Sequence, residues 1–438
     1  MSPLELSRNF ALMRTWRLSR ERLPSLHAQM PALTDAEVDL AALRSLPITD
    51  KAIYEARAKE WLAVNRSLPD FFIRSGGTTG APTIQWGFLP ERRPAPQQPH
   101  ARDGEKKILY LKAGSGRQGA VPHFPKDTGA LIAPLRDAEG YRIMVELLGQ
   151  RFDFDGYEPQ FSRLMIPLPA AKKLAHYMLM HRIDCSDFAL TEVHTFSSFV
   201  SRAWRARIEA VLQATLIDHY GFTEIQNARA HECAVCGYYH FIDGVYPEIV
   251  DADERPLAAP GAVGKLLVTR LLAENDQAMP IVRFDTGDIV EIGTPCTKAG
   301  ECGFKPWGKE GHSLCIDGDD GRLYPVRYGD VQEAIDFDPL VARIDNVRHS
   351  LVTPTEGDTF PKWRLRRPPA PARRAVLEIE MVFEPLLFAD TWRSFEAGLR
   401  RKLAAGNPDF ARAAAMDFQL EIVGLSPGTL TDREVMKC

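Results

Sequence analysis

A short loop rich in glycine and hydroxyl side chains constrains most strongly what this chain can fold into. The stretch from Arg74 to Thr83 reads RSGGTTGAPT, and it follows the apolar run Phe71–Ile73, which predicts a short buried strand. Glycine lets a backbone approach a ligand closely, and successive backbone N–H groups in such a loop can form an anion-binding concavity. The loop therefore favours phosphate binding, and a surface turn is the alternative. It is not a Walker loop, because no Lys-Ser or Lys-Thr pair follows at the required spacing.

Length and composition limit the class of protein. A chain of 438 residues is too long for one ordinary core and suits two domains. Its 45% hydrophobic and 26% charged residues are typical of a soluble globular protein. A net charge of −4 and a pI near 6.3 give no general attraction to nucleic acid or to an anionic membrane. No apolar run reaches the roughly 18 residues of a membrane helix, and the first residues carry no signal-peptide pattern, so we expect a cytoplasmic protein without nucleic-acid or membrane partners.

The N-terminal part is predicted to be helical and shows no catalytic chemistry. Apolar residues recur at three- and four-residue spacing in Leu4–Leu23, Asp35–Leu46 and Asp50–Asn65. Thr34 and Thr49 precede two of these segments and are expected to be their N-caps. We interpret this region as a packing element.

Strand and helix patterns follow a charged, proline-rich stretch at residues 90–105, which we expect to be an exposed loop. Short apolar runs predict strands, and longer amphipathic segments predict helices. Strands are expected at Ile108–Leu111, Leu164–Pro167, Phe188–His194, Ala214–Asp218, Tyr246–Val250, Lys265–Thr269, Arg343–Arg348, Arg374–Phe383 and Asp417–Gly424. Helices are expected at Pro169–Met180, Ser201–Gln213, Tyr328–Phe337 and Phe388–Leu403, and a hairpin turn within Cys315–Tyr324.

Two later stretches resolve the ambiguity of the first loop. Tyr220–Glu224 reads YGFTE, and Arg283–Asp288 reads RFDTGD. In this order and at these distances, the three stretches resemble the signature of the adenylate-forming, acyl-CoA synthetase-like superfamily. The closer resemblance is to its phenylacetate–coenzyme A ligase branch, which the segment from about residue 189 to residue 292 follows element by element. The three motifs are specific together, whereas each one alone is a weak signal.

The resemblance implies an α/β fold in two domains. Residues 1–307 are expected to form a large N-terminal adenylate-forming domain, made of β-sheets with flanking helices, that holds the ATP and acyl sites. Residues 308–438 are expected to form a small, mobile α+β lid domain. The stretch Trp307–His312 stands where the family has the hinge around which the small domain rotates.

The resemblance also assigns roles within a nucleotide site. Tyr220 would stack near the adenine, Thr223 would touch the α-phosphate, Glu224 would hold magnesium and Asp288 would bind both ribose hydroxyls. The chemistry agrees, because Mg²⁺ takes one or two carboxylates together with phosphate oxygens, and carboxylate oxygens can accept from two adjacent hydroxyls. The residues predicted to bind ATP or AMP are Ser75, Gly76, Gly77, Thr78, Thr79, Gly80, Tyr220, Gly221, Thr223, Asp288 and Lys309.

Two lysines complete the catalytic apparatus that the resemblance implies. Lys309 stands where a basic residue of the family contacts ATP phosphates. Lys437 matches the lysine that reaches into the site during adenylation, where its ammonium group would stabilise the charge that develops between carboxylate and α-phosphate. A solvent-exposed terminal lysine is the alternative for Lys437. The residues expected to take part in catalysis are Lys437, Thr223 and Glu224.

The acyl-substrate pocket is expected after the strand that ends at His194. The superfamily lines this position with a Gly-Gly-Glu-like turn, and this chain has Phe196-Ser197-Ser198 in its place. The residues predicted to line the pocket are therefore His194, Phe196, Ser197 and Ser198. A flat, aromatic acid could stack on Phe196, and a core position for Phe196 and Phe199 is the alternative.

The cysteines predict a structural metal site. Of seven cysteines, two form a Cys-x2-Cys pair followed by Gly237, and a second pair lies farther along the chain. Such pairs suit a tetrahedral zinc bound by thiolates, and four thiolates leave no open position for catalysis. His231 or His240 could replace one cysteine, and free buried cysteines are the alternative. The predicted zinc ligands are Cys233, Cys236, Cys296 and Cys302.

The function implied by the resemblance is an AMP-forming ligase. A small, aromatic carboxylic acid would react with Mg·ATP to give an acyl adenylate, and the acyl group would then pass to coenzyme A. Transfer to an amine, as in secondary-metabolite pathways, is one alternative. A binding protein on a ligase scaffold that has lost turnover is another. A homodimer is suggested by analogy with the family alone.

Overall fold

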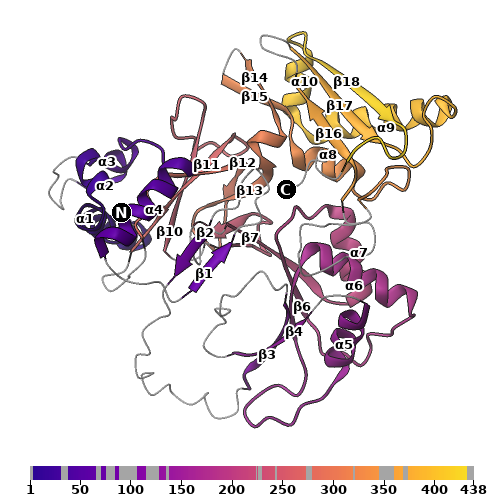
Figure 1. Ribbon diagram of the computed structural model, residues 1–438, viewed down its shortest axis with the longest axis horizontal. Coiled ribbons are helices and arrows are strands. Elements are labelled where there is room, and N and C mark those ends of the chain that lie inside the picture. The colour runs from indigo at the N-terminus through magenta and orange to yellow at the C-terminus, as the bar shows by residue number, and fades with distance from the viewer. Residues whose placement is uncertain are drawn as a thin grey trace. The chain divides into compact units, whose positions relative to one another are not determined.

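The computed structural model describes most of the chain, in fourteen stretches. These are residues 3–30, 38–65, 71–74, 84–87, 106–114, 128–134, 138–222, 224, 229–241, 244–272, 279–318, 321–344, 360–367 and 373–431. The chain divides into two compact units, each made of two separate parts of the sequence (Figure 1). The first unit comprises Met1–Pro96 and Tyr220–Lys305, and the second comprises Gln97–His219 and Pro306–Cys438.

Four helices begin the first unit: α1 (Pro3–Arg22), α2 (Pro24–Gln29), α3 (Leu40–Arg44) and α4 (Lys51–Asn65). The predicted helices Leu4–Leu23 and Asp50–Asn65 are confirmed, and the described part of Asp35–Leu46 holds only the five-residue α3. Buried side chains of these helices pack against buried residues of strands in the same unit. This core includes Leu12, Trp16, Leu43, Tyr54, Trp61, Leu266, Val268, Phe284 and Val290.

Aspartates cap α3 and α4. The Asp39 carboxylate accepts a hydrogen bond from the backbone N–H three residues later at 2.9 Å, and Asp50 does the same at 2.8 Å. The prediction that Thr49 is an N-cap is wrong, because its buried hydroxyl donates to the carbonyl of Val282 at 2.7 Å. Thr34 lies outside the described residues.

The strands of the first unit are antiparallel wherever their pairing is defined. β1 (Phe71–Arg74) pairs with β2 (Ile84–Gly87). The other strands follow the order β10-β11-β12-β13-β9-β8, in which β11 pairs with both of its neighbours and β8 pairs with β9. Their bounds are β8 (Arg229–Glu232), β9 (Tyr239–Phe241), β10 (Val245–Val250), β11 (Val263–Arg270), β12 (Phe284–Pro295) and β13 (Cys302–Lys309). The predicted domain boundary at residues 307 and 308 falls inside β13, and the two-domain division stays a prediction.

The first part of the second unit is a parallel sheet with helices. Its strand order is β7-β6-β5-β3-β4, and every pair is parallel. Parallel strands need long crossover connections and are covered by helices; here α6 packs on β5 and β6 and against α7 (Figure 1). The elements are β3 (Ile108–Gly114), β4 (Thr128–Pro134), α5 (Ala138–Gly149), β5 (Arg163–Pro167), α6 (Leu168–Met180), β6 (Glu192–Phe196), α7 (Arg202–Leu212) and β7 (Thr215–Gly221). The predicted strands and helices of this region are confirmed, although β6 begins four residues after the predicted start at Phe188.

The second part of this unit is an α+β arrangement. β16 pairs antiparallel with β17, which pairs parallel with β18. The predicted helix Phe388–Leu403 corresponds to α9, which buries Phe395, Leu399 and Leu403, and the predicted hairpin is formed by β14 and β15. The elements are η2 (Glu310–His312), β14 (Leu314–Gly318), β15 (Gly321–Val326), α8 (Tyr328–Ile335), β16 (Trp363–Arg366), β17 (Arg374–Glu380), α9 (Ala389–Gly406), α10 (Pro408–Ala414) and β18 (Gln419–Leu425). Among the described residues, no helix has the length and apolar character to cross a membrane.

Candidate functional site

Two residues predicted to bind AMP meet in the first unit. The hydroxyl of Tyr220 donates a hydrogen bond to Oδ2 of Asp288 at 2.7 Å, although 68 positions separate them in the sequence. Tyr220 lies near the end of β7, and Asp288 lies on β12 with only 6% of its surface exposed. A hydrogen bond to an ionised carboxylate is stronger than one between neutral groups. The structure thus joins the second motif to the third through a charged hydrogen bond.

The residues before Asp288 build the bend that orients it. Gly287 has a φ of +69°, a left-handed conformation that glycine adopts without strain. Its N–H donates to Oδ1 of Asp285 at 2.7 Å. The Thr286 hydroxyl donates to the carbonyl of Leu266 at 2.9 Å and accepts from the N–H of Asp288 at 3.1 Å. The Asp-Thr-Gly-Asp sequence is therefore a locally hydrogen-bonded irregularity within β12, where the register against β11 shifts, with Asp288 at its end.

Arg283 is used for folding and is not available to a ligand. Only 2% of its surface is exposed, and its guanidinium donates to the carbonyls of Arg44, at 2.9 Å, and Leu46. Its Nε lies 3.4 Å from Oε2 of Glu248. Burial raises the pKa of Glu248, and the charges of Arg283 and Arg44 oppose that rise. These contacts fasten the segment before α4 to the start of β12.

The ring of Tyr220 lies among phenylalanines. Phe222, Phe241 and Phe304 meet it edge-to-face, with centroid distances of 6.1, 6.2 and 5.3 Å. Edge-to-face contacts are a favourable geometry for aromatic pairs, so the ring is held while its hydroxyl reaches Asp288. Stacking of Tyr220 on adenine stays a prediction.

The structure describes three of the other residues predicted to bind the nucleotide or its metal, and the rest lie outside the described part of the chain. Glu224 is half-buried, and its backbone carbonyl accepts a hydrogen bond from the hydroxyl of Tyr54 at 3.3 Å. Gly221 ends β7. Lys309 belongs to the second unit, at the end of β13, and its carbonyl accepts from Ser313 Oγ at 3.2 Å. Ser75, Gly76, Gly77, Thr78, Thr79, Gly80, Thr223 and Lys437 lie outside the described residues.

His194, predicted for the acyl pocket, is part of a polar chain in the second unit. Its Nδ1 lies 2.8 Å from Nε2 of His219, and its Nε2 lies 3.0 Å from Oε2 of Glu192. Glu192 also accepts from Nε of Arg163 at 2.7 Å. A carboxylate only accepts, so Nε2 of His194 carries the proton and Nδ1 accepts from His219. Burial lowers the pKa of His194, and the charge of Glu192 opposes that change.

Glu192 and His219 were missed by the sequence analysis. Period-two alternation places Glu192 on the same face of β6 as His194 and could have indicated it. His219 lies on the neighbouring strand, and its pairing with Phe196 in register has no signal in the sequence.

The rest of the predicted acyl turn follows β6. Phe196 is half-buried at the strand end, and Ser197 has a φ of +79°, which is rare for a residue with a side chain. Ser198 is exposed to an intermediate degree in the same loop. Phe199 stacks with Trp307 at 6.3 Å between centroids and is half-buried against the core of α8 and β14–β18.

The structure gathers three of the four predicted zinc ligands and adds a histidine. Ligand atoms of Cys233, Cys236, His240 and Cys296 all lie within 4.8 Å of one another. Cys302 is exposed and is not part of this group. His240 was one of two histidines considered as a replacement, and the structure selects it over His231.

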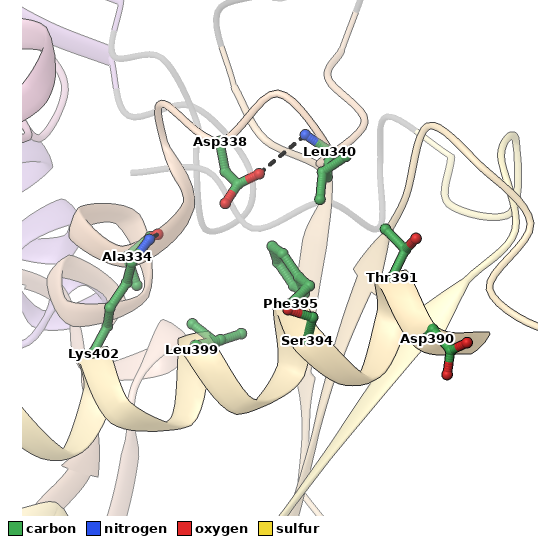
Figure 2. Close-up of a pocket in the computed structure, with 10 residues that line it drawn as sticks. Ala334, Asp338, Leu340, Asp390, Thr391, Ser394, Phe395, Leu399 and Lys402 are labelled. Atoms are coloured by element: carbon green, nitrogen blue, oxygen red, sulfur yellow. Dashed lines mark hydrogen bonds between the residues drawn. The ribbon is translucent and has the colours of Figure 1, made fainter. Parts of the chain in front are cut away.

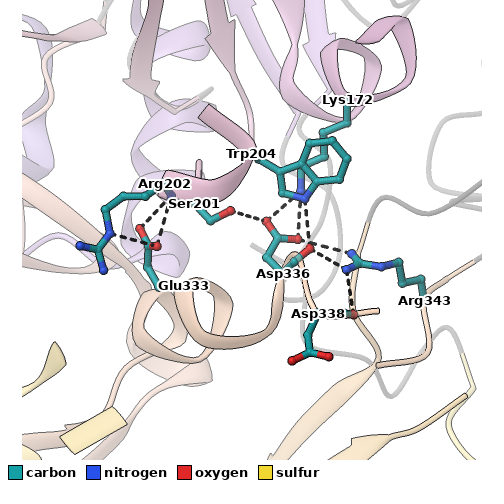
Figure 3. A network of polar contacts seen from close by, with 8 residues as sticks. All are labelled: Lys172, Ser201, Arg202, Trp204, Glu333, Asp336, Asp338 and Arg343. Atoms are coloured by element: carbon teal, nitrogen blue, oxygen red, sulfur yellow. Dashed lines mark hydrogen bonds and ion pairs between the residues drawn. The ribbon is translucent and has the colours of Figure 1, made fainter. Parts of the chain in front are cut away.

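A buried ion-pair network connects the two parts of the second unit (Figure 3). Lys172 of α6 lies 3.1 and 3.0 Å from the two carboxylate oxygens of Asp336, which follows α8. Ser201 donates to the same carboxylate at 2.9 Å. The indole of Trp204 and the guanidinium of Arg343 donate to the Asp336 carbonyl at 3.1 and 2.7 Å. Burial lowers the pKa of Lys172, and the Asp336 charge opposes that change.

The same unit contains an open pocket of about 540 Å³ (Figure 2). Figure 2 shows Phe395 and Leu399 of α9 below the segment that carries Asp338 and Leu340. Lys402 closes one end by donating to the carbonyl of Ala334 at 2.8 Å. None of the residues that line the pocket belongs to the predicted nucleotide, acyl or metal sites, so the pocket is assigned no catalytic role.

Comparison with known proteins gives partial sequence matches. No family model matches the chain. The phenylacetate-coenzyme A ligase of Aromatoleum evansii is 31% identical over 145 residues, which are 32% of this chain and 31% of the relative. The phenylacetate-coenzyme A ligase of Escherichia coli (strain K12) is 35% identical over 95 residues, which are 21% of each chain. Both matches span less than a third of the relatives.

Solved structures match along nearly the whole chain. An open conformation of 2-hydroxyisobutyryl-CoA ligase, in complex with 2-HIB-AMP and CoA, gives a TM-score of 0.61 and 13% identity, and covers 98% of this chain and 89% of that one. The same ligase in its postadenylation state gives a TM-score of 0.59. The fold is shared with these CoA ligase structures. The partial matches to two phenylacetate-coenzyme A ligases confirm the resemblance to that branch over at most about a third of the chain.

Proposed function

We propose that the protein is an AMP-forming ligase that activates a small, aromatic carboxylic acid and transfers its acyl group to coenzyme A. The observation that carries this proposal is the hydrogen bond between Tyr220 and Asp288, which joins two adenylate-forming motifs on a fold shared with CoA ligases. The partial relatives are named as phenylacetate-coenzyme A ligases, which supports an aromatic acid. Because ATP and coenzyme A are cytoplasmic substrates, we also infer a cytoplasmic location.

The proposed reaction has two balanced steps. In the first step, a carboxylate oxygen of the acid attacks the α-phosphorus of ATP, the bond to the β-phosphate breaks and pyrophosphate leaves. In the second step, the thiolate of coenzyme A attacks the acyl carbonyl and AMP leaves with the bonding electrons. Neither step changes an oxidation state. The protein contributes mainly by positioning the reactants and by stabilising the charge that develops.

Each predicted residue has a defined task in this scheme. Asp288 accepts hydrogen bonds from the ribose hydroxyls, and Tyr220 holds its carboxylate in place by the 2.7 Å hydrogen bond. The backbone N–H groups of the Ser75–Gly80 loop and the hydroxyl of Thr223 bind phosphate oxygens. Lys437 neutralises the charge between the reacting carboxylate and the α-phosphate.

The chemistry of Glu224 fits its proposed role as a magnesium ligand. Its carboxylate is a hard oxygen donor of the kind that Mg²⁺ prefers. The residue is only half-buried, and its backbone carbonyl accepts a hydrogen bond from the Tyr54 hydroxyl at 3.3 Å. When bound, magnesium supplies positive charge to the phosphates.

Pyrophosphate release tests the proposal. The protein is incubated with Mg·ATP and a panel of aryl and alkyl acids without an acceptor, and acyl-AMP is then detected by mass spectrometry. Release confined to a few aryl acids supports the proposal, and the addition of coenzyme A or an amine then identifies the acceptor. Nucleotide binding without release from any acid would favour a binding protein on a ligase scaffold.

A further inference from the structure

The cysteine–histidine group has the dimensions of a metal centre. Sγ of Cys233 lies 3.8 Å from Sγ of Cys296, and Sγ of Cys236 lies 3.2 Å from Nε2 of His240. Two thiolates on a tetrahedral zinc, each with a bond of 2.3 Å, lie about 3.8 Å apart. A disulfide needs sulfurs in bonding contact near 2.05 Å, roughly half of the observed separation. The four side chains are therefore arranged around a common centre and are not cross-linked.

A tight turn between β8 and β9 presents the first two cysteines. The N–H of Gly237 donates to the carbonyl of Cys233 at 2.7 Å, and the N–H of Cys233 donates to the carbonyl of Tyr238 at 2.8 Å. Gly237 has a φ of +71°. Backbone N–H groups of Val235 and Cys236 also point at the Cys233 sulfur. The turn places both sulfurs in the group that includes Cys296 and His240.

A second turn of the same kind presents Cys296 after β12. The N–H of Gly300 donates to the carbonyl of Cys296 at 2.8 Å, and the N–H of Cys296 donates to the carbonyl of Glu301 at 2.9 Å. Gly300 also has a φ of +71°. Cys296 is buried with 3% of its surface exposed, whereas Cys302 lies beyond the turn, on β13, and is exposed. Two separate turns of matching geometry thus converge on one centre.

Glycines leave room for the histidine and for the turn beside it. A Cβ atom at Gly303 would lie 2.8 Å from Nε2 of His240, which is closer than real Cβ atoms approach. A Cβ atom at Gly293 would lie 2.5 Å from the ring of Tyr238, which follows the first turn. His240 can therefore approach the sulfurs only because β13 carries no side chain at residue 303.

We propose that Cys233, Cys236, His240 and Cys296 bind one zinc ion. Three thiolates and one imidazole form a complete tetrahedral shell, so the ion has no open position and its role is structural. Each cysteine thiol releases one proton to solvent on binding, and no electron is transferred. The ion ties the β8–β9 turn to the end of β12, the strand that carries Asp288.

Metal analysis of ligand and control variants tests the proposal. We expect about one zinc ion per chain in the full-length protein purified without chelator. Cys296→Ser and His240→Ala should lose it. Cys302→Ser and His231→Ala are the controls, one cysteine on β13 and one histidine on β8 of the same unit, and should keep it. Loss of zinc in Cys302→Ser with retention in His240→Ala would overturn the assigned ligand set.

A measurement on the unmodified protein guards against variants that fail to fold. X-ray absorption at the zinc edge should fit three sulfurs near 2.3 Å and one nitrogen near 2.0–2.1 Å. Removal of the metal by a chelator should lower the unfolding midpoint, and added zinc should restore it. A four-sulfur fit, or a protein free of zinc whose midpoint is unchanged by zinc and chelator, would contradict the proposal. Neither readout depends on ligase activity.

Discussion

The Tyr220–Asp288 pair and the Lys172–Asp336 pair are both contacts between residues far apart in the sequence, 68 and 164 positions respectively. The first lies within motifs that the sequence displays, and Asp288 retains 6% exposure. The second involves no motif, and side-chain exposure is 5% for Lys172 and 2% for Asp336. A carboxylate with partial access can serve a ligand, whereas the buried Asp336 carboxylate, which is hydrogen-bonded by Lys172 and Ser201, serves the fold. The two pairs therefore differ in what their loss should affect.

The largest expected effect is on stability, from Asp336→Ala. The change leaves the Lys172 ammonium buried without its partner, and breaking a buried pair in this way costs about 3–5 kcal/mol. Chemical denaturation followed by circular dichroism should show a much lower unfolding midpoint. Asp338→Ala, two residues away and partly exposed, is the control and should change the midpoint little. Equal midpoints for both variants would show that the network does not stabilise the unit.

The next effect is on nucleotide affinity, from Tyr220→Phe. The change removes one hydrogen bond to a carboxylate, a contribution of about 1.5–3 kcal/mol. Because the hydroxyl orients Asp288, AMP affinity should fall by about tenfold or more. Titration calorimetry with AMP measures this loss. Unchanged affinity would mean that Tyr220 only packs among the phenylalanines.

Gly287→Ala should have a smaller effect, on thermal stability. The variant tests the backbone conformation before Asp288 without removing a polar side chain. There is open space for the methyl group, so the cost comes from φ of +69° alone and is about 1–2 kcal/mol. Gly398→Ala, in the interior of α9 with open space and no positive φ, is the control and should stabilise slightly. Thermal unfolding compares the two. If Gly398→Ala lowered the unfolding temperature and Gly287→Ala did not, the positive φ of Gly287 would not be a source of strain for other residues.

The smallest effect concerns pH and His194. Burial lowers the pKa of His194 in the folded protein, so the unfolded chain binds more protons below its own pKa of about 6.5. His194 therefore does not lower the free energy of unfolding above about pH 6.5. Below that pH the free energy of unfolding falls, because the unfolded chain takes up the proton more readily. His194→Gln should therefore reduce the loss of stability between pH 7 and pH 5. The charged and polar groups around the ring are Glu192, Arg163, His219 and Tyr110. An identical pH profile for the variant would exclude His194 as the cause.

Short-range patterns predicted the elements of this fold well. The helix Pro169–Met180 and the strand Leu164–Pro167 each match the structure to within one residue. In the strand, buried and half-buried residues alternate as the period of two requires. Thr49 was assigned wrongly as a cap because its hydroxyl bonds to Val282, 233 positions away. The same limit applies to the Lys172–Asp336 network, in which no residue is part of a local pattern.

In the candidate sites, too, local patterns could be predicted from the sequence, whereas contacts between distant residues could not. Asp288 was predicted from its motif, and its neighbours Asp285, Thr286 and Gly287 form the hydrogen-bonded backbone that precedes it. His240 could only be one of two options in the sequence, because the choice depends on the turn geometry after β12 and on the space left by Gly303. Cys302 was predicted because it forms a second cysteine pair with Cys296 in the sequence, and the fold places it outside the group.

Binding of AMP to the wild type, Asp288→Ala and Asp253→Ala tests the central claim most directly. Asp253 is an exposed aspartate of the same unit and controls for the loss of a negative charge. Titration calorimetry should detect binding by the wild type and by Asp253→Ala, and no measurable binding by Asp288→Ala, because the ribose hydroxyls lose their acceptor. Equal affinity of all three proteins for AMP would contradict the assignment of a nucleotide site to Asp288.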